Sequence, residues 1–399
     1  MRKHILFIVE NNPVPHDIRV WNEAQAAREF GYEVTIICPR NKKNPFRFEV
    51  INGITIYRHY IPFEAGGKFS FLFEYINALF WEFVYSLYVF IKKPFQFIHA
   101  ANPPDHIFII AAFYKLFKVK YIFDHHDITP ENYLAKFNNM DFLYRTTLFM
   151  EKLTFNTADI VISTNESYKN VALTRGKKQS DEVFVVRNGP NLANIPSVTK
   201  NDNWKDGFDY LVSYIGNIGN QEGINLLLDI VHKLVFERNV TNVKFIIIGT
   251  GPNWEKMVKL SKAMNLEKYV TFTGYIPYED FYEILATSDL CINPEQRNEF
   301  TDKSTMIKIM DYMTFGKPIV QFETTEGKVT AGDAAYYVGE NSIENFTDAI
   351  IHLIKNPNKR KQMGEIGRLR IEKELNWDEQ KKNLKMAYNS LETNKINAF

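Results

Sequence analysis

The sequence predicts an α/β protein with two successive domains, each built around a parallel sheet. The first observation is length, because 399 residues are too many for one hydrophobic core. The second is order: apolar runs of strand length alternate with helical patterns in both halves, which is typical of parallel sheets. The third is that the expected strands end in polar or small residues, where ligands bind in such sheets.

The first half begins with a strand over 5–10 and a helix over 18–30 that Gly31 closes. Apolar runs indicate further strands at 34–39, 54–60, 97–100, 120–123, 160–163 and 183–187. We expect this first domain to cover residues 1–190.

The second half follows an aperiodic, turn-rich linker over 188–207. Its expected strands are 210–215, 243–248, 270–273, 290–293, 319–322 and 335–337. We expect this domain to cover 205–376. The chain then ends in a charged helical region in which Trp377 is an apolar anchor.

Composition excludes several classes of protein. The formal net charge of +1 gives no electrostatic case for a nucleic-acid partner. Cys38 and Cys291 lie far apart in apolar runs, so we expect buried free thiols, and two cysteines form no zinc framework. The N-terminal apolar run is too short for a signal peptide.

An aromatic-rich segment over 69–97 permits two interpretations. Glu74, Asn77 and Glu82 interrupt it, so it lacks the run of about 18 apolar residues that a membrane-spanning helix needs. It is either a long helix with a broad buried face or a helix that rests on a membrane surface, helped by Lys68, Lys92 and Lys93.

The stretch 298–320, NEFTDKSTMIKIMDYMTFGKPIV, is the centre of the predicted site. Asp302, Ser304 and Thr305 are expected to cap a short helix that stops at Gly316. Lys308 and Asp311 share the polar face of this helix. A cation and a carboxylate beside a helix start can hold a nucleotide, with phosphate at the helix start and Lys and with ribose at Asp. The alternative is a solvated surface ion pair.

A glycine-rich loop over 216–223 follows the strand 210–215 and opens a helix. Gly216 and Gly219 let backbone N–H groups approach an anion. No Gly-Lys-Ser/Thr follows, and the dinucleotide spacing of glycines is absent, so a plain tight turn is the alternative. Gly251 lies in a similar loop after the next strand.

Polar clusters also follow strands of the first half. In Asp124-His125-His126-Asp127, one His can contact a substrate while an Asp orients it; a metal site and structural hydrogen bonding are the alternatives. His16, Asp17 and Arg19, together with Asn102 and Asp105, either cap and pair or line a substrate cleft. No Asp-x-Asp motif occurs, which removes the usual way of holding a sugar nucleotide through a divalent cation.

Several motifs together carry a resemblance to a known family. They are HDIRVWNEA, NPPD, FDHHDITPE, NGPN, YIGNIGNQEG, FTGYIPYED and KIMDYMTFGKPIV. Over nearly its whole length the chain resembles a family 4 glycosyltransferase of the GT-B fold, from a subgroup that makes bacterial cell-surface polysaccharides. The resemblance implies two Rossmann-like domains that face each other across a cleft, with the final helix, 377–399, crossing back to the first domain.

The resemblance also implies the reaction and its partners. A nucleotide-diphosphate sugar, UDP-linked ahead of GDP-linked, donates its sugar with retention at the anomeric carbon and without a metal or another cofactor. The acceptor is a glycan, most readily a lipid-linked one. Such an enzyme is cytoplasmic, and peripheral association with the inner face of the membrane is a further expectation.

By this resemblance, the C-terminal domain binds the donor and the N-terminal domain binds the acceptor. The expected donor site comprises Gly216, Asn217, Gly219, Gly251, Tyr275, Ile276, Lys303, Ser304, Thr305, Lys308 and Asp311. Asp311 holds ribose, and His125 or His126 reaches the donor sugar, so that these histidines and Lys308 are the expected catalytic residues. The expected acceptor residues are His16, Asp17, Arg19, Asn102 and Asp105.

Two departures from the family pattern keep other functions open. The family often has two glutamates eight positions apart; here Asp311 replaces the second and Lys303 the first. Asn217 and Glu222 stand where the glycine loop usually carries Arg and Lys. The alternatives are a degenerate transferase-like partner subunit and a sugar-nucleotide epimerase of the same fold.

Overall fold

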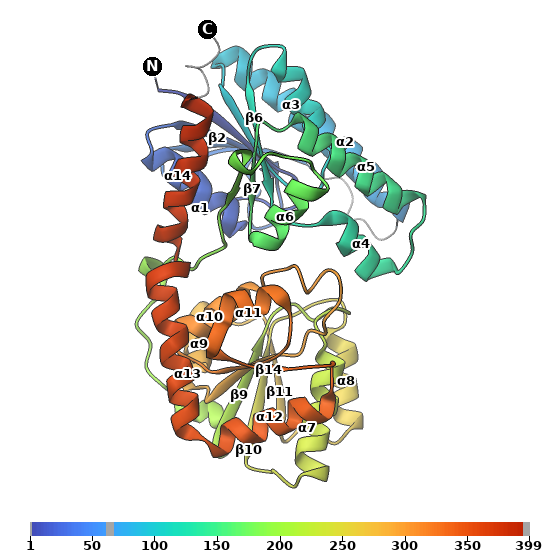
Figure 1. Cartoon of the computed structure of the whole chain (residues 1–399), viewed down its shortest axis with the longest axis vertical. Helices are drawn as coiled ribbons and strands as arrows, with labels where there is room; N and C mark the ends of the chain where they lie inside the picture. Colours follow the sequence, from blue (N-terminus) through green and yellow to red (C-terminus); the bar gives the residue numbers. More distant parts are fainter. Residues whose placement is uncertain (1, 61–67, 394–399) are drawn as a thin grey trace. The chain divides into compact units, whose positions relative to one another are not determined.

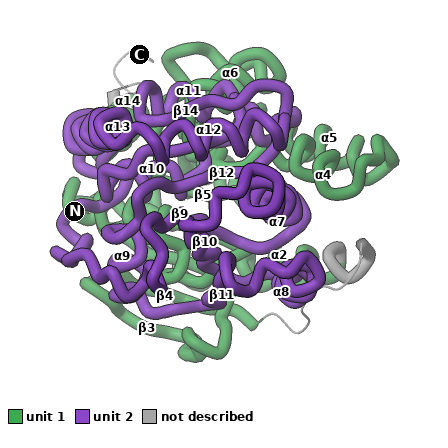
Figure 2. Tube along the Cα trace, turned by 90° about the horizontal axis from the view of Figure 1, so that it is seen from below, with its two compact units in different colours: residues 1–188, 380–399 green, residues 189–379 purple. Residues whose placement is uncertain are grey.

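The computed structural model describes residues 2–60 and 68–393, and the chain divides into two compact units. Unit 1 comprises Met1–Asn188 with Gln380–Phe399, and unit 2 comprises Gly189–Glu379 (Figure 2). The chain therefore passes from unit 1 to unit 2 near the start of the expected linker and returns to unit 1 within its last helix (Figure 1).

Unit 1 is built on an eight-stranded sheet in the order β3-β4-β2-β1-β5-β6-β7-β8. The strands are β1 (His4–Val9), β2 (Glu33–Pro39), β3 (Phe48–Ile51), β4 (Ile54–His59), β5 (Phe97–Ala101), β6 (Lys120–His125), β7 (Ile160–Ser163) and β8 (Val183–Val185). All neighbouring pairs are parallel except β3 and β4.

Seven helices belong wholly or partly to the described part of unit 1. They are α1 (Ile18–Glu29), α2 (Lys68–Lys92), α3 (Phe108–Lys115), α4 (Thr129–Phe137), α5 (Phe142–Thr157), α6 (Glu166–Thr174) and α14 (Trp377–Thr393), which begins in unit 2. The long helix expected within 69–97 is present as α2, and it ends before β5 begins at Phe97.

The antiparallel edge strand β3 is absent from the expected elements. Its four residues alternate between exposed and half-buried positions, because it lies at the edge of the sheet. The short, partly exposed run FEVI resembles a loop, whereas the fully buried β1 forms a continuous apolar run.

Unit 2 is built on a six-stranded, wholly parallel sheet in the order β11-β10-β9-β12-β13-β14. The strands are β9 (Tyr210–Ile215), β10 (Val243–Ile248), β11 (Val270–Gly274), β12 (Leu290–Asn293), β13 (Ile319–Phe322) and β14 (Ala335–Val338). The order reverses between β9 and β12, and such switch points are where ligands bind in open α/β sheets.

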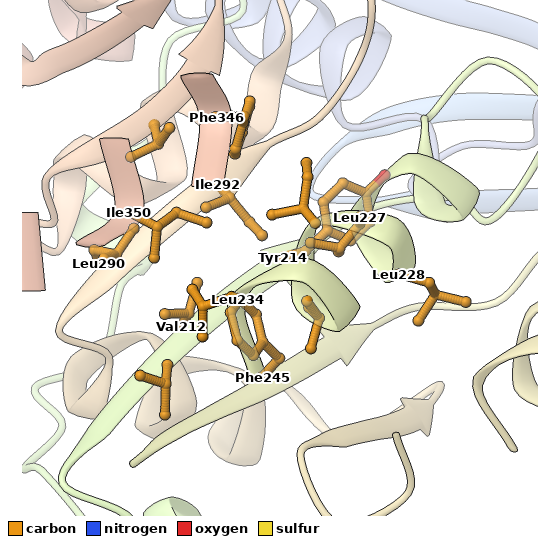
Figure 3. Packing of buried hydrophobic residues seen from close by; sticks show 14 of the residues in the cluster. Val212, Tyr214, Leu227, Leu228, Leu234, Phe245, Leu290, Ile292, Phe346 and Ile350 are labelled. Carbon is orange, nitrogen blue, oxygen red and sulfur yellow. The ribbon is translucent and has the colours of Figure 1, made fainter. Parts of the chain in front are cut away.

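Helices cover this sheet and form several buried apolar clusters with it. They are α7 (Ile224–His232), α8 (Trp254–Ala263), α9 (Tyr278–Thr287), α10 (Ile307–Thr314), α11 (Thr325–Ala331), α12 (Ile343–Lys355) and α13 (Pro357–Arg370). Figure 3 shows how Leu227 of α7 and Ile350 of α12 pack with Val212, Phe245 and Ile292 from the strands. This buried apolar surface fixes the strand ends that carry the site.

The C-terminal part of α14 is anchored in unit 1. The Tyr388 hydroxyl lies 2.9 Å from Nδ1 of the buried His99 on β5, and Lys381 Nζ donates to Glu29 at 2.9 Å. Trp377, at the start of the same helix, is buried in unit 2, where its N–H donates to the Pro190 carbonyl at 2.9 Å. Residues from Gln380 onward in this last helix are therefore part of unit 1, whereas its first residues belong to unit 2.

Candidate active site

Helix α10 is fixed at the switch point of the unit 2 sheet by the hydroxyl group of Tyr312. This hydroxyl accepts a hydrogen bond from the Ile215 N–H at 2.9 Å and donates one to the Ile292 carbonyl at 3.2 Å. Tyr312, Ile309 and Met313 are buried. The helix thus lies against the ends of β9 and β12, as expected from the apolar face of the sequence.

The start of α10 differs from the expected capped start. Met306 precedes the helix and makes no side-chain cap. Asp302 instead accepts hydrogen bonds from the N–H of Thr325, at 2.8 Å, and from its hydroxyl, at 3.0 Å. Ser304 Oγ donates to the Phe300 carbonyl at 2.7 Å. The capping prediction for Asp302, Ser304 and Thr305 is wrong because these residues fold the preceding turn or contact α11.

The consequence is an uncapped helix start. The N–H groups of Ile307 and Lys308 find no acceptor within residues 2–60 and 68–393. Unpaired N–H groups at the positive end of a helix dipole attract an anion. The other end agrees with expectation, since the chain turns at Gly316 with φ of +62°.

Lys308 pairs with Glu295, which the sequence analysis did not identify. Its ammonium group donates to the Glu295 carboxylate and, at 3.1 Å, to the Tyr214 hydroxyl. Burial favours the neutral amine, but the Glu295 carboxylate outweighs it and raises the pKa of Lys308. The alternative of a surface Lys308–Asp311 ion pair is wrong, because the lysine turns toward the end of β12.

Asp311 is therefore left without a counterion. It is half-buried, and no hydrogen bond or ion pair to its carboxylate occurs in the described part of the chain. Burial raises the pKa of Asp311 to about 7. A desolvated carboxylate without a partner costs stability, which is typical of positions kept for a ligand.

The glycine loop lies directly beside the Lys308 ammonium group. A Cβ on Gly216, whose φ is +151°, would lie 3.0 Å from Lys308 Nζ and 2.8 Å from the Tyr214 hydroxyl. A Cβ on Gly251 would lie 2.6 Å from Ile218 N, so Gly251 lets the two loops approach each other. Gly216 and Lys308, far apart in sequence, thus form one site.

Glu222 fills part of this loop. Its carboxylate accepts hydrogen bonds from the N–H groups of Gly219, at 3.1 Å, and Gln221, at 3.2 Å, and from the Asn217 side chain at 3.0 Å. The expectation that the Gly219 N–H is open to a diphosphate is therefore not met. The protein's own carboxylate occupies an anion position in the loop.

Two other expected donor residues lie at the end of β11, beside the β10 loop. Tyr275 is 73% exposed, and Ile276 is half-buried against Ile248 and its neighbours. The Gly249 N–H donates to the Gly274 carbonyl at 3.2 Å, which joins the two strand ends. Tyr275 and Ile276 therefore flank the same sheet edge as the glycine loop.

Lys303 lies in the turn before α10 and forms an ion pair with Glu299 at 3.1 Å. Arg297 pairs with Asp302 at 3.0 Å. Lys308 is therefore the cation whose position next to the glycine loop is fixed by contacts in this structure.

In unit 1, Arg19 and Asp17 have structural partners. Asp17 caps α1 by accepting from the Val20 N–H at 3.0 Å. Arg19 contacts Asp124 at 2.6 Å and Glu23 at 3.0 Å, and its side chain is 7% exposed. These contacts favour the alternative stated above, in which Asp17 caps a helix and Arg19 forms ion pairs, over a role of the two residues in acceptor binding. His16 is exposed.

The two adjacent histidines at the end of β6 lie in different environments. His125 is fully buried among Phe123, Phe155 and Tyr168, and burial lowers its pKa to about 3. Its ring packs in the core of unit 1, which does not favour its expected role at the donor sugar. His126 is half-buried, and its Nδ1 lies 3.4 Å from Asp124, which raises the pKa of His126 against the effect of burial.

Asn102 and Asp105 tie the loops after β5 and β6 together. Asn102 accepts from the N–H groups of His126, at 2.9 Å, and Asp127, at 3.0 Å, and donates to Asp105 at 2.9 Å. Both side chains are buried, and burial raises the pKa of Asp105 to about 6. They position His126 and are poorly placed for direct contact with an acceptor.

A second polar pair at this sheet edge escaped the sequence analysis. Glu10 directly follows β1, and its carboxylate lies 2.9 Å from Nε2 of His106, which lies in the loop between β5 and α3. Burial raises the pKa of Glu10 to about 8, and Glu10 raises the pKa of His106 against the effect of burial. A charged residue directly after a buried strand was the available signal.

One group of potential metal ligands occurs among the described residues: Glu23, His99 and Asp124. Arg19 already neutralises the two carboxylates, and His99 Nε2 lies 3.3 Å from Glu23. This group is a buried ion-pair network around the arginine.

Family models match both units of the chain. A model described as Glycosyltransferase Family 4 matches residues 18–194, and one described as Glycosyl transferases group 1 matches residues 209–356. The chain belongs to glycosyltransferase family 4. The second match contains the glycine loop, Glu295, Lys308 and Asp311.

Two relatives of this family 4 chain show how far the sequence similarity extends. An uncharacterized glycosyltransferase of Methanocaldococcus jannaschii is 25% identical over 369 residues, which cover 90% of each chain. The GPI3 subunit of the Saccharomyces cerevisiae phosphatidylinositol N-acetylglucosaminyltransferase is 21% identical over 293 residues, 71% of this chain and 60% of the subunit.

Solved structures show that the family 4 chain has the GT-B fold of two Rossmann-like units. Sucrose-phosphate synthase from Thermosynechococcus elongatus aligns with a TM-score of 0.79 at 16% identity, covering 98% of this chain and all of the other. Anabaena Alr3699/HepE, solved in complex with UDP-glucose, aligns with a TM-score of 0.71 at 13% identity and covers 98% of this chain and 99% of its own.

Proposed function

We propose that this glycosyltransferase moves a sugar from a nucleotide-diphosphate donor, UDP-linked ahead of GDP-linked, to a glycan acceptor with retention at the anomeric carbon. The observation that carries the proposal is Asp311, a half-buried carboxylate without a counterion, one turn from Lys308, whose ammonium group lies beside the glycine loop. Ribose hydroxyls are neutral donors that satisfy such a carboxylate at little desolvation cost.

The donor then lies across the ends of β9, β10, β11 and β12. Asp311 accepts hydrogen bonds from the ribose hydroxyls, while Lys308 and the unpaired N–H groups at the start of α10 bind the diphosphate. Backbone atoms of Tyr275 and Ile276 border the base. The Anabaena protein solved with UDP-glucose supports a UDP-linked donor for this fold.

Lys308 supplies the positive charge that the reaction needs. Cleavage of the sugar–phosphate bond leaves negative charge on the diphosphate, and a fixed cation stabilises that charge without reorganisation. The raised pKa keeps Lys308 protonated at neutral pH, and the Gly216 backbone gives the phosphate access to it. A lysine and a helix start thus replace a divalent cation, which makes the proposed reaction metal-independent.

The acceptor is a lipid-linked glycan in the synthesis of a bacterial surface polysaccharide, and the enzyme works at the cytoplasmic face of the membrane. The yeast relative, named for phosphatidylinositol, supports a lipid acceptor. In unit 1 the acceptor meets His106 and His126, whose side chains are each 13% exposed at the carboxyl edge of the sheet.

Donor binding and turnover test this proposal. Wild-type protein is titrated calorimetrically with UDP, GDP and the common sugar nucleotides, and then assayed for donor hydrolysis with and without EDTA. Asp311→Ala and Lys308→Ala should each weaken binding, with Asp333→Ala and Lys256→Ala as exposed controls in the same unit. Unchanged turnover in both site variants contradicts the site, and loss of activity with EDTA contradicts metal independence.

A further inference from the structure

The outer face of helix α2 is apolar although it is exposed. Phe73, Ile76, Phe80 and Ile91 recur at helical spacing and are 70%, 57%, 58% and 81% exposed. Helices on the surface of a soluble domain normally turn charged residues outward. Here the arrangement is reversed, because Glu82 of the same helix is fully buried.

Helix α3 extends this apolar face. Phe113 contacts Phe83 and Phe117 contacts Phe90, with ring centroids 5.2 and 5.4 Å apart, so α3 packs along one side of α2. At the end of α3, Leu116 is 78% exposed and Phe117 is 54% exposed. The set Phe73, Ile76, Phe80, Ile91, Leu116 and Phe117 is called the α2–α3 face below; Figure 1 shows both helices on the side of unit 1 away from α14.

The charges around the α2–α3 face have one predominant sign. Lys92 and Lys118 are exposed at the ends of the two helices, and Arg145 and Lys152 are exposed on α5, which packs against α3. The nearby acidic groups are less exposed: Glu74 of α2 is half-buried, Glu151 is buried against Arg175, and Asp159 is paired with Lys115 and Lys120. Exposed apolar and cationic side chains together match an anionic bilayer surface.

We propose that the α2–α3 face docks unit 1 onto an anionic lipid bilayer, with its apolar side chains in the interface and the cations at the headgroups. Among the described residues, none of the helices meets the length and hydropathy that a membrane span requires. The proposed function supplies the purpose, because a lipid-linked acceptor then lies beside the enzyme. The docking itself does not depend on catalysis.

Vesicle flotation of the full chain without substrates tests the docking. Wild-type protein should float with phosphatidylglycerol vesicles and at least tenfold less with phosphatidylcholine vesicles, and 0.5 M salt should weaken binding. The double variant Phe80→Glu/Ile91→Glu should bind at least tenfold more weakly. Met386→Glu, which alters a 54% exposed methionine on α14 of the same unit, is the control and should bind as wild type.

Two further measurements keep the test decisive. Circular dichroism and UDP titration of each variant should match wild type, since the substituted side chains are exposed and UDP is proposed to bind unit 2. Equal flotation of wild type and the double variant overturns the proposal. The proposal is also overturned if the wild-type protein does not float and forms a dimer that the double substitution dissociates. In that case the α2–α3 face joins two copies of the chain. Failed UDP binding with intact flotation refutes only the proposed function.

Discussion

Lys308 and Glu295 form an ion pair beside the glycine loop, although they lie thirteen positions apart in the chain, with a turn between them. The side chains are 12% and 7% exposed, so the pair is largely removed from solvent. Glu295 therefore keeps Lys308 charged, and Asp311, one turn along the same helix, does not pair with that lysine.

Removal of the Glu295 charge should lower the stability of the protein but raise its affinity for UDP. Glu295→Gln leaves the buried ammonium without its counterion, so we expect a loss of roughly 3 kcal/mol in the free energy of unfolding. UDP should bind more tightly and restore much of that stability, because the diphosphate takes over the charge. Denaturant unfolding and calorimetry measure both effects. Equal UDP affinity in variant and wild type would show that Lys308 does not meet the phosphates.

Asp311 should make both stability and donor affinity depend on pH. Its pKa in the folded protein, about 7, lies above the ordinary 3.8, so the folded state holds the proton more tightly. Its contribution to stability therefore falls as pH rises from about 4 to 7. Asp311→Asn should raise the melting temperature relative to wild type at pH 8 and change it little at pH 4.

The same ionisation should control ribose binding. Wild-type affinity for UDP should rise between pH 6 and pH 8, as the carboxylate loses its proton and can accept hydrogen bonds from both hydroxyls. Asp311→Asn should bind weakly with a flatter profile over that interval. If the pH profiles of UDP affinity are parallel for wild type and Asp311→Asn, the titrating group is not Asp311.

Glu222 should oppose binding of the diphosphate, because its carboxylate accepts the hydrogen bond from the Gly219 N–H group. Glu222→Gln keeps the shape of the side chain and removes its charge, so UDP should bind several-fold more tightly. The affinity for uridine, which lacks phosphate, should not change. A weaker UDP complex in Glu222→Gln would show instead that the carboxylate organises the loop for binding.

Arg19 should contribute to the stability of unit 1 and not to donor binding. Arg19→Ala leaves Asp124 and Glu23 buried without their cation, which should cost roughly 3–5 kcal/mol. Arg19→Lys should recover only part, because lysine lacks the planar fork of the guanidinium. UDP affinity, measured at a temperature where the variant is folded, should equal that of wild type.

His106 and His126 should affect transfer to the acceptor without affecting donor binding. His106→Ala and His126→Ala should raise KM for the acceptor or lower kcat, while the Kd for UDP stays constant. Asn102→Ala should impair transfer to the acceptor indirectly, because Asn102 accepts a hydrogen bond from the His126 N–H group and so positions His126. A change in UDP affinity in either histidine variant would contradict the division of tasks between the units.

The buried strands were predictable and the side-chain pairings were not. Residues 210–215, 243–248, 290–293 and 319–322 form strands with the expected bounds, since strands covered on both faces form continuous apolar runs. By contrast, Glu295 and Glu222 acquire their roles from contacts that only the folded loops create. The spacing of Lys308 and Asp311 suggested a pair, but the structure gives the lysine a closer partner.

The two histidines show where a sequence pattern misleads. Neighbouring residues at the end of a strand point to opposite faces of the sheet, so His125 and His126 cannot share one environment. His125 packs against Phe155, while His126 faces Asp124. The order of strands decides which histidine is buried, and local sequence does not contain that information.

The contact between Asp311 and ribose is tested most directly by a thermodynamic cycle. The Kd of UDP and of 2′,3′-dideoxy-UDP is measured by calorimetry for wild type and Asp311→Ala, at pH 8. If Asp311 binds the hydroxyls, either change alone should weaken binding about tenfold or more, and both together should cost little more than one. If the two losses multiply, or if Asp311→Ala binds UDP as wild type does, the proposed donor site is wrong.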